Sequence, residues 1–248
     1  MVAPITGKVV AHRQWTDTLF SIQIEADINP FEPGQFGRIG LMIDDKPIMR
    51  PYSFVNAADE TPLEFYYILV EGGPLTQRLP HLPVGSDILI NEKSNGFLVL
   101  SEVPDAQQLW MLSTGTALGP FLSILKSAPV WQRFEELVLV HAVRQTKELT
   151  YQDQINQLVA VGAGRLRYIP FVSREETDFA MRGRIPPALQ DGSLAARAGL
   201  TTPTPENAQF MLCGNPEMVK DTSEVLYQLD FLKNRRRTPG QVTVENYW

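Results

Sequence analysis

The stretch Leu109-Trp110-Met111-Leu112-Ser113-Thr114-Gly115-Thr116-Ala117-Leu118-Gly119-Pro120 decides the fold expected of this 248-residue chain. Its first four residues form an unbroken apolar run, which is typical of a strand buried on both faces. A glycine-containing turn follows, and a helix is expected from about Gly119 to Ser127. A turn between a strand and a helix can hold a pyrophosphate, because its backbone amides face the anion. Since the GxGxxG pattern is missing, a tight connection without a ligand is the alternative.

Strand and helix continue to alternate after this stretch. Further strands are expected at Leu137–Val140, Leu166–Val172 and Phe210–Cys213. Helical segments are expected at Tyr151–Val159 and near Ile185–Leu189. A further helix is expected to begin at Asn215-Pro216, with apolar positions from Met218 to Leu229. Apolar strands that alternate with amphipathic helices predict a parallel sheet covered on both faces.

The first hundred residues have a different pattern of short strands and turns. Strands are expected at Leu19–Ile24, Leu63–Val70 and Ile88–Ile90, and Gly/Pro turns separate them. This pattern predicts a closed antiparallel barrel. We therefore expect a barrel over residues 1–101 and a parallel-sheet α/β domain over 102–248, with a linker at Val103–Gln108 and a ligand cleft between the two.

Composition excludes several classes of protein. An apolar fraction of 44% with 20% charged residues fits a soluble globular protein, and no apolar run approaches a membrane span. The N-terminus lacks the features of a secretory signal, and the single cysteine favours a reducing cytoplasm. One cysteine and three dispersed histidines predict no disulfide, iron–sulfur cluster or zinc site. A net charge of −6 argues against nucleic acid as a partner.

Three arginines follow the glycine-containing turn in the sequence. Arg144 comes after the Leu137–Val140 run, Ser173-Arg174 after the next strand, and Arg184 at the start of a helix. The carboxyl ends of parallel strands are where open α/β sheets bind ligands. Each arginine alone fits an ordinary surface position, but three at successive strand ends can hold an additional phosphate. With the pyrophosphate turn, they predict NADP(H) as a ligand.

The motif Arg50-Pro51-Tyr52-Ser53 lies on an expected strand. An arginine can bind phosphate oxygens in bidentate fashion, a tyrosine ring can stack on a flat heterocycle, and a serine hydroxyl can donate to a ring nitrogen. These three side chains fit a flavin nucleotide lying along the strand. The alternative is an ordinary edge strand, marked by Pro51.

Several other segments are candidates for binding. The turn Glu71–Thr76 can bind a pyrophosphate oxygen if Thr76 opens a helix, and otherwise it is a loop capped by this threonine. Cys213-Gly214-Asn215 ends a strand, and its thiol can face a nicotinamide or pack as a small hydrophobe. Near the C-terminus, Tyr247-Trp248 can cover a flavin, and Glu245 is a candidate proton-relay group. The basic run Lys233–Arg237 fits either a solvated helix end or a docking patch for an acidic partner.

Taken in order, these motifs resemble the ferredoxin/flavodoxin–NADP+ reductases. The motifs are RPYSFVN, EGGPLT, TGTALGP, VHAVR, VSRE, GR, CGNPEMV and the terminal aromatic pair. The resemblance covers nearly the whole chain and is closest to the short bacterial type that ends in tryptophan. It implies an FAD-binding barrel, an NADP-binding α/β domain, and reversible transfer of a hydride from NADPH to FAD and then of single electrons to flavodoxin or ferredoxin.

The resemblance also implies roles for individual residues. Tyr52, Ser53 and Cys213 are the catalytic candidates, with Tyr52 against the isoalloxazine ring and Ser53 near flavin N5. The FAD candidates are Arg50, Pro51, Tyr52, Ser53, Tyr66, Gly73, Pro74, Leu75, Thr76, Thr116, Tyr247 and Trp248. The NADP candidates are Thr114, Gly115, Arg144, Ser173, Arg174, Arg184, Gly214 and Asn215. The acidic carrier protein is expected to dock on a monomer through Arg235, Arg236 and Arg237.

Other functions remain open at this point. A flavin or ferric reductase, or the reductase component of an oxygenase, can share both domains, although NADH-preferring relatives need no phosphate-binding arginines. A non-catalytic module with a nucleotide-like cleft is an alternative of another class.

Overall fold

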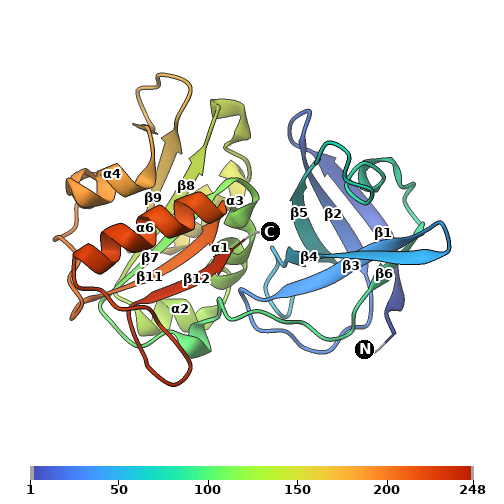
Figure 1. Ribbon diagram of the computed structural model, residues 1–248, viewed down its shortest axis with the longest axis horizontal. Helices are drawn as coiled ribbons and strands as arrows, with labels where there is room; N and C mark the ends of the chain where they lie inside the picture. The colour runs from blue at the N-terminus through green and yellow to red at the C-terminus, as the bar shows by residue number, and fades with distance from the viewer. Residues whose placement is uncertain (1–2, 247–248) are drawn as a thin grey trace.

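The computed structural model describes residues 3–246, which form two lobes that pack side by side (Figure 1). The N-terminal lobe is a six-stranded antiparallel sheet in the order β4-β3-β6-β1-β2-β5. An isolated bridge between Phe54 and Phe65 joins the two edges of this sheet, and Val55 N donates to Glu64 O at 3.0 Å. The sheet therefore closes into the predicted barrel, whose strands are β1 (Ile5–Gln14), β2 (Leu19–Glu25), β3 (Phe36–Ile43), β4 (Lys46–Ser53), β5 (Leu63–Ile68) and β6 (Asp87–Ile90).

The C-terminal lobe is a six-stranded parallel sheet in the order β10-β9-β8-β7-β11-β12. Because β7 lies in the middle, connections run outward from it in both directions and its carboxyl end lies beside those of β8 and β11. The strands are β7 (Gln108–Thr114), β8 (Glu136–Val143), β9 (Leu166–Val172), β10 (Met181–Arg182), β11 (Ala208–Gly214) and β12 (Val242–Asn246).

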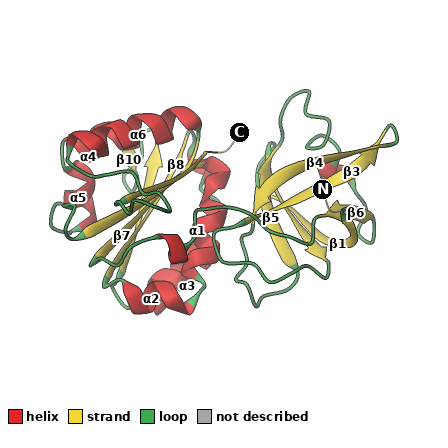
Figure 2. Ribbon diagram, turned by 60° about the horizontal axis from the view of Figure 1, so that its bottom comes forward, coloured by secondary structure: helices red, strands yellow, loops and turns green. Residues whose placement is uncertain are grey.

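Helices cover both faces of this parallel sheet, as predicted (Figure 2). On β7, Leu109 and Met111 pack with the first three helices, whereas Trp110 and Leu112 face the last three. This alternation explains the unbroken apolar run, since both faces of the strand are buried. The helices are α1 (Leu118–Leu125), α2 (Ala128–Arg133), α3 (Gln152–Val161), α4 (Ile185–Gln190), α5 (Ser193–Ala198) and α6 (Pro216–Gln228).

Hydrogen bonds join the two lobes along one seam. Ser123 Oγ on α1 donates to Asn56 O at 2.7 Å. Tyr151 Oη donates to Glu64 Oε1 at 2.6 Å, and Thr150 Oγ1 donates to the hydroxyl of Tyr66 at 2.9 Å. The 3-10 turn Leu100–Glu102 spans the position after residue 101 where a domain boundary is expected. This boundary stays a prediction.

Candidate functional site

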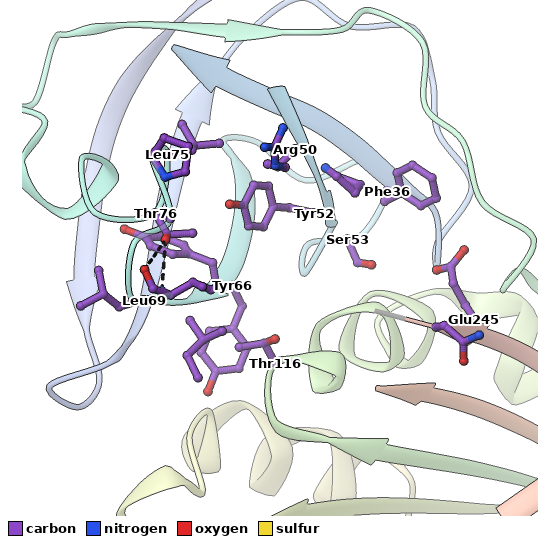
Figure 3. A pocket seen from close by; sticks show the side chains of 17 residues that line it. Phe36, Arg50, Tyr52, Ser53, Tyr66, Leu69, Leu75, Thr76, Thr116 and Glu245 are labelled. Atoms are coloured by element: carbon purple, nitrogen blue, oxygen red, sulfur yellow. Dashed lines mark hydrogen bonds between the residues drawn. The ribbon is translucent and has the colours of Figure 1, made fainter. Parts of the chain in front are cut away.

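A cavity of about 840 Å³ lies between the barrel and the parallel sheet (Figure 3). Most of its wall belongs to β4, β5 and the turn after β5, while three residues come from the other lobe. Every FAD candidate within the described residues lines it, although these candidates come from four separate segments of the chain. The lining residues are Phe36, Arg50, Pro51, Tyr52, Ser53, Tyr66, Tyr67, Ile68, Leu69, Val70, Gly73, Pro74, Leu75, Thr76, Thr116, Glu245 and Asn246.

The end of β4 supplies the first wall of the cavity. Arg50 is exposed and uses one guanidinium nitrogen, Nη1, to donate to Met49 O at 2.9 Å. Tyr52 meets the ring of Tyr67 edge to face, with centroids 6.1 Å apart. Burial raises the pKa of Tyr52 to about 12, although the Arg50 charge opposes the rise, so this ring is neutral at physiological pH. Ser53 is 3% exposed and also lines the cavity.

Two tyrosines of β5 supply the second wall. The Thr150 hydroxyl on the other lobe holds the Tyr66 hydroxyl, so both lobes fix this ring. Burial raises the pKa of both Tyr66 and Tyr67. The Tyr67 hydroxyl is buried without a hydrogen-bond partner among the described residues. A buried hydroxyl without a partner is unfavourable in the protein alone and is consistent with a polar ligand in the cavity.

The turn after β5 differs from one expectation. Thr76 does not open an α-helix: its hydroxyl accepts from Val70 N at 3.1 Å and donates to Val70 O at 3.4 Å. The chain continues instead in tight turns to the 3-10 turn Leu79–His81. In residues 3–246, no hydrogen bond engages the amides of Leu75 and Thr76, so the turn still offers two donors at the cavity wall.

The C-terminal lobe contributes Thr116, Glu245 and Asn246 to the lining of the cavity, and Figure 3 shows the first two. β12 carries the last two, and the sequence analysis did not predict this strand. Burial raises the pKa of Glu245 to about 7, although a backbone hydrogen bond from Phe97 opposes the rise. Glu245 Oε2 has no hydrogen-bond partner in the described part of the chain. Tyr247 and Trp248, both predicted to cover a flavin, lie outside the described residues.

The glycine-containing turn and the Gly214-Asn215 segment meet beside this cavity. β7 ends at Thr114, the 3-10 turn Gly115–Ala117 follows, and α1 begins at Leu118, which confirms the predicted strand–turn–helix context. Asn215 N donates to Thr114 Oγ1 at 2.9 Å. Gly214 has φ +140°, and a Cβ there would lie 2.1 Å from Thr114 Oγ1, so only glycine fits this approach. Four of the NADP candidates, Thr114, Gly115, Gly214 and Asn215, therefore lie next to one another.

The three arginines lie in register at the ends of β8, β9 and β10. Val172 of β9 pairs with Val143 of β8 and with Arg182 of β10. Arg144 is the first residue after Val143, whereas Arg174 and Arg184 are the second residues after Val172 and Arg182. Arg174 N also donates to Arg144 O at 2.9 Å. All three side chains are exposed, and no salt bridge or hydrogen bond engages their guanidiniums among the described residues. The adjacent Ser173 hydroxyl donates to Val143 O.

Cys213 has a different position from that expected of a catalytic group. Its side chain is 0% exposed and packs in the core between the sheet and α1 to α3. The thiol does not line the cavity. Cys213 ends an apolar run, and this pattern alone cannot distinguish a core cysteine from one that faces a ligand. Its proposed contact with a nicotinamide stays a prediction.

The basic run Lys233–Arg237 is not the solvated helix end that one interpretation of the sequence predicted. α6 ends at Gln228, and Arg235–Arg237 lie in a hairpin loop before β12, so these residues are not a helix end. Arg236 pairs with Glu102 at 3.3 Å and lies over the Phe97 ring, 5.4 Å from its centroid. Gly96 precedes this ring in the chain, and a Cβ at Gly96 would lie 3.3 Å from the cavity residues Phe36 and Glu245.

Sequence reasoning missed several lining residues, including Phe36, Tyr67 and Asn246. Phe36 is opposite Ser53 in the β3–β4 register, a pairing that only the fold supplies. Two further findings concern residues 3–246: no helix in this range is long and apolar enough to cross a membrane, and no group of three or more His, Cys, Asp or Glu could hold a metal ion.

Comparisons with known proteins agree with this geometry. Residues 111–224 match the model of the oxidoreductase NAD-binding domain family. The chain is 43% identical to the flavodoxin/ferredoxin–NADP reductase of Escherichia coli K12, with 98% of each chain covered. It is 38% identical to the ferredoxin–NADP reductase of Azotobacter vinelandii, covering 96% of this chain and 95% of the relative. A crystal structure of the Neisseria gonorrhoeae ferredoxin NADP+ reductase with bound FAD and NADP superposes with a TM-score of 0.94 at 33% identity, covering both chains fully. The chain belongs to the flavodoxin/ferredoxin–NADP reductase family.

Proposed function

We propose that this chain is an FAD-containing reductase that takes electrons from NADPH and delivers them one at a time to flavodoxin or ferredoxin. The observation that carries the proposal is the cavity itself, because it gathers the Arg50–Ser53 motif, Tyr66, the Gly73–Thr76 turn and Thr116 around one space. Flavodoxin/ferredoxin–NADP reductases are oxidoreductases, and FAD and NADP(H) are the cofactors of this family.

The residues of the cavity fit a flavin dinucleotide. Its volume lies in the range typical of ligand sites, and aromatic rings with few polar groups form its wall. The exposed Arg50 guanidinium and the amides of Leu75 and Thr76 are the donors we assign to the FAD phosphates. We assign the neutral Tyr52 ring to a stacking contact with the isoalloxazine. The Tyr67 hydroxyl and Glu245 Oε2 are buried polar atoms without a hydrogen-bond partner among the described residues. When bound, FAD supplies the exchange between a two-electron donor and one-electron acceptors.

NADPH selection depends on the register of the three arginines. We assign Arg174, Arg184 and Ser173 to the 2′-phosphate and Arg144 to the remaining phosphates. Unpaired guanidiniums at successive strand ends can bind a dianionic phosphate without first breaking an ion pair. Thr114, Gly115, Gly214 and Asn215 then hold the pyrophosphate and the nicotinamide end beside the cavity.

The acidic carrier is proposed to dock on Arg235, Arg236 and Arg237. These side chains are exposed, and Phe97 and Gly96 connect Arg236 to the cavity wall. A local basic patch on a chain of net charge −6 steers an acidic partner to one face. A monomeric state and a cytoplasmic location remain part of the proposal.

The direct test is the visible spectrum of the purified protein, followed by anaerobic stopped-flow reduction with NADPH and with NADH. We expect a flavin spectrum, reduction by NADPH at much lower concentrations than by NADH, and reoxidation by flavodoxin or ferredoxin. A protein that cannot be reconstituted with FAD contradicts the proposal. Equal reaction with both coenzymes favours a flavin reductase or an oxygenase component instead.

A further inference from the structure

His141 is a buried polar residue directly beneath the glycine-containing turn. It lies on β8, with Ser113 of β7 and Pro170 of β9 opposite it, and its side chain is 0% exposed. Its Nε2 atom is 3.1 Å from Gly115 O, and its Nδ1 atom has no hydrogen-bond partner among the described residues. A carbonyl oxygen can only accept, so Nε2 must carry the proton and Nδ1 is left as a bare acceptor.

The neutral ring is the stable form at this position. Burial lowers the pKa of His141 to about 4, although the bond to Gly115 opposes the shift. The bare Nδ1 atom costs stability, since a buried acceptor without a donor is unfavourable. An apolar residue of similar size would avoid this cost. The one contact that an apolar residue cannot make is the bond to Gly115 O.

The bond to Gly115 O fixes the orientation of the next amide. A trans peptide is planar, and its C=O and N–H point in opposite directions. With the Gly115 carbonyl aimed at His141, the N–H of Thr116 points away from the buried ring. No hydrogen bond engages this N–H in the part of the chain that the structure describes, and Thr116 itself lines the cavity.

The Gly115–Thr116 peptide is free of steric restraint on its glycine side. Gly115 has φ +56°, and a Cβ at this position would meet no atom within 4 Å. A flip of this peptide changes ψ of Gly115 and φ of Thr116, and glycine tolerates the change in its own ψ because it has no Cβ. The backbone restraint on the Gly115 carbonyl is a bond from Leu118 N in the 3-10 turn. A flipped peptide would present an oxygen where the dinucleotide meets a donor.

We propose that His141 is a positioning residue, which holds the Gly115–Thr116 peptide with its N–H toward the bound dinucleotide. This inference rests on the proposed function, because it assumes that the turn faces NADP(H). The arginine set lies on β8 to β10, whereas the His141 bond acts on the turn after β7. Loss of the bond should therefore weaken ligands that reach the turn and spare ligands held by the arginines alone.

The test uses a matched pair of variants in the holoenzyme. In His141→Gln the side-chain amide places an N–H near the position of Nε2, whereas in His141→Asn the amide is one methylene too short. His141→Phe removes both nitrogens and keeps the ring shape. Isothermal titration calorimetry measures the Kd of NADP+ and of adenosine 2′-monophosphate for each variant, and thermal melting reports stability.

We expect the Kd of NADP+ to rise about five- to tenfold in His141→Asn and His141→Phe, the effect of one hydrogen bond. His141→Gln should stay near wild type, and the Kd of adenosine 2′-monophosphate should not change. Unchanged NADP+ binding in all three variants overturns the inference alone. Parallel loss of both ligands with a lowered Tm shows a merely structural role and also overturns it. A wild-type protein that binds neither ligand removes the proposed function, and the inference with it.

Discussion

Replacement of Arg174 by alanine is the sharpest test of coenzyme selection. The Arg174 guanidinium is exposed and unpaired among the described residues, so its removal breaks no internal salt bridge and should leave the Tm unchanged. A hydrogen bond between charged groups contributes about 1.5–3 kcal/mol, and the exposure of this site places the loss near the lower end. Since 1.4 kcal/mol is a factor of ten, we expect the KM for NADPH to rise roughly tenfold.

Steady-state reduction of ferricyanide measures this effect without a carrier protein. With NADH, which lacks the 2′-phosphate, the KM of Arg174→Ala should match that of the wild type. Arg182→Ala, on the adjacent strand β10, is the control, because Arg182 is exposed but already paired with Glu176. The KM for NADPH should also depend less on ionic strength in Arg174→Ala than in the control. An equal loss with both coenzymes, or an equal effect of Arg182→Ala, refutes the assignment.

Three further predictions concern the carrier patch, the cavity carboxyl and the turn. The double variant Arg235→Gln with Arg237→Gln should raise the KM for flavodoxin at low salt and reduce the dependence of this KM on salt. Ferricyanide reduction should stay at the wild-type rate. Unchanged kinetics with the carrier contradict the proposal that the carrier docks on this patch. Burial raises the pKa of Glu245, so the carboxyl holds its proton more tightly in the folded state, and its contribution to stability should fall as the pH rises from about 4.5 to about 7. Thermal melts across this range should show a decline in the stability of the wild type, at most about 3 kcal/mol, that Glu245→Gln lacks. Gly214→Ala should lower the Tm and raise the KM for NADPH, because its Cβ meets Thr114 in addition to the strain of a positive φ. Gly115→Ala has open space around it and should cost only the strain of its left-handed φ of +56°, about 1–2 kcal/mol. Equal melting of both variants would show that the contact with Thr114 does not matter.

The parallel half of the fold could be predicted because its central strands are buried on both faces. Leu109–Leu112 and Leu137–Val140 are therefore unbroken apolar runs in the sequence. A turn is expected after each of them, because a parallel strand must connect to a helix. The edge strands β10 and β12 were not predicted, since neither contains an unbroken apolar run like those of β7 and β8. Their positions depend on pairing with β9 and β11, which is a tertiary property.

The candidate site shows the same division between local and tertiary information. Arg50, Tyr52 and Thr116 could be selected because their residue types and their place near turns have a chemical meaning. Phe36 and Tyr67 could not, since an aromatic residue on a strand fits a core equally well. The burial of Cys213 and the hairpin around Arg236 depend on contacts with distant segments, so sequence patterns left each with two interpretations.

The hydrogen bonds across the seam limit how such reductases can be recombined. Glu64 is 8% exposed, and the Tyr151 hydroxyl that donates to it belongs to the other lobe. A chimera that joins this barrel to the nucleotide half of a distant homologue without that tyrosine would lose the Tyr151 bond. Glu64 would then keep only Gln23 Nε2, at 3.4 Å, as a side-chain donor, and a buried polar group that loses a hydrogen bond is destabilising. Crossover points in a shuffled library therefore have to transfer the donors at 123, 150 and 151 together with the acceptors at 56, 64 and 66, even though the two sets lie on opposite sides of the linker.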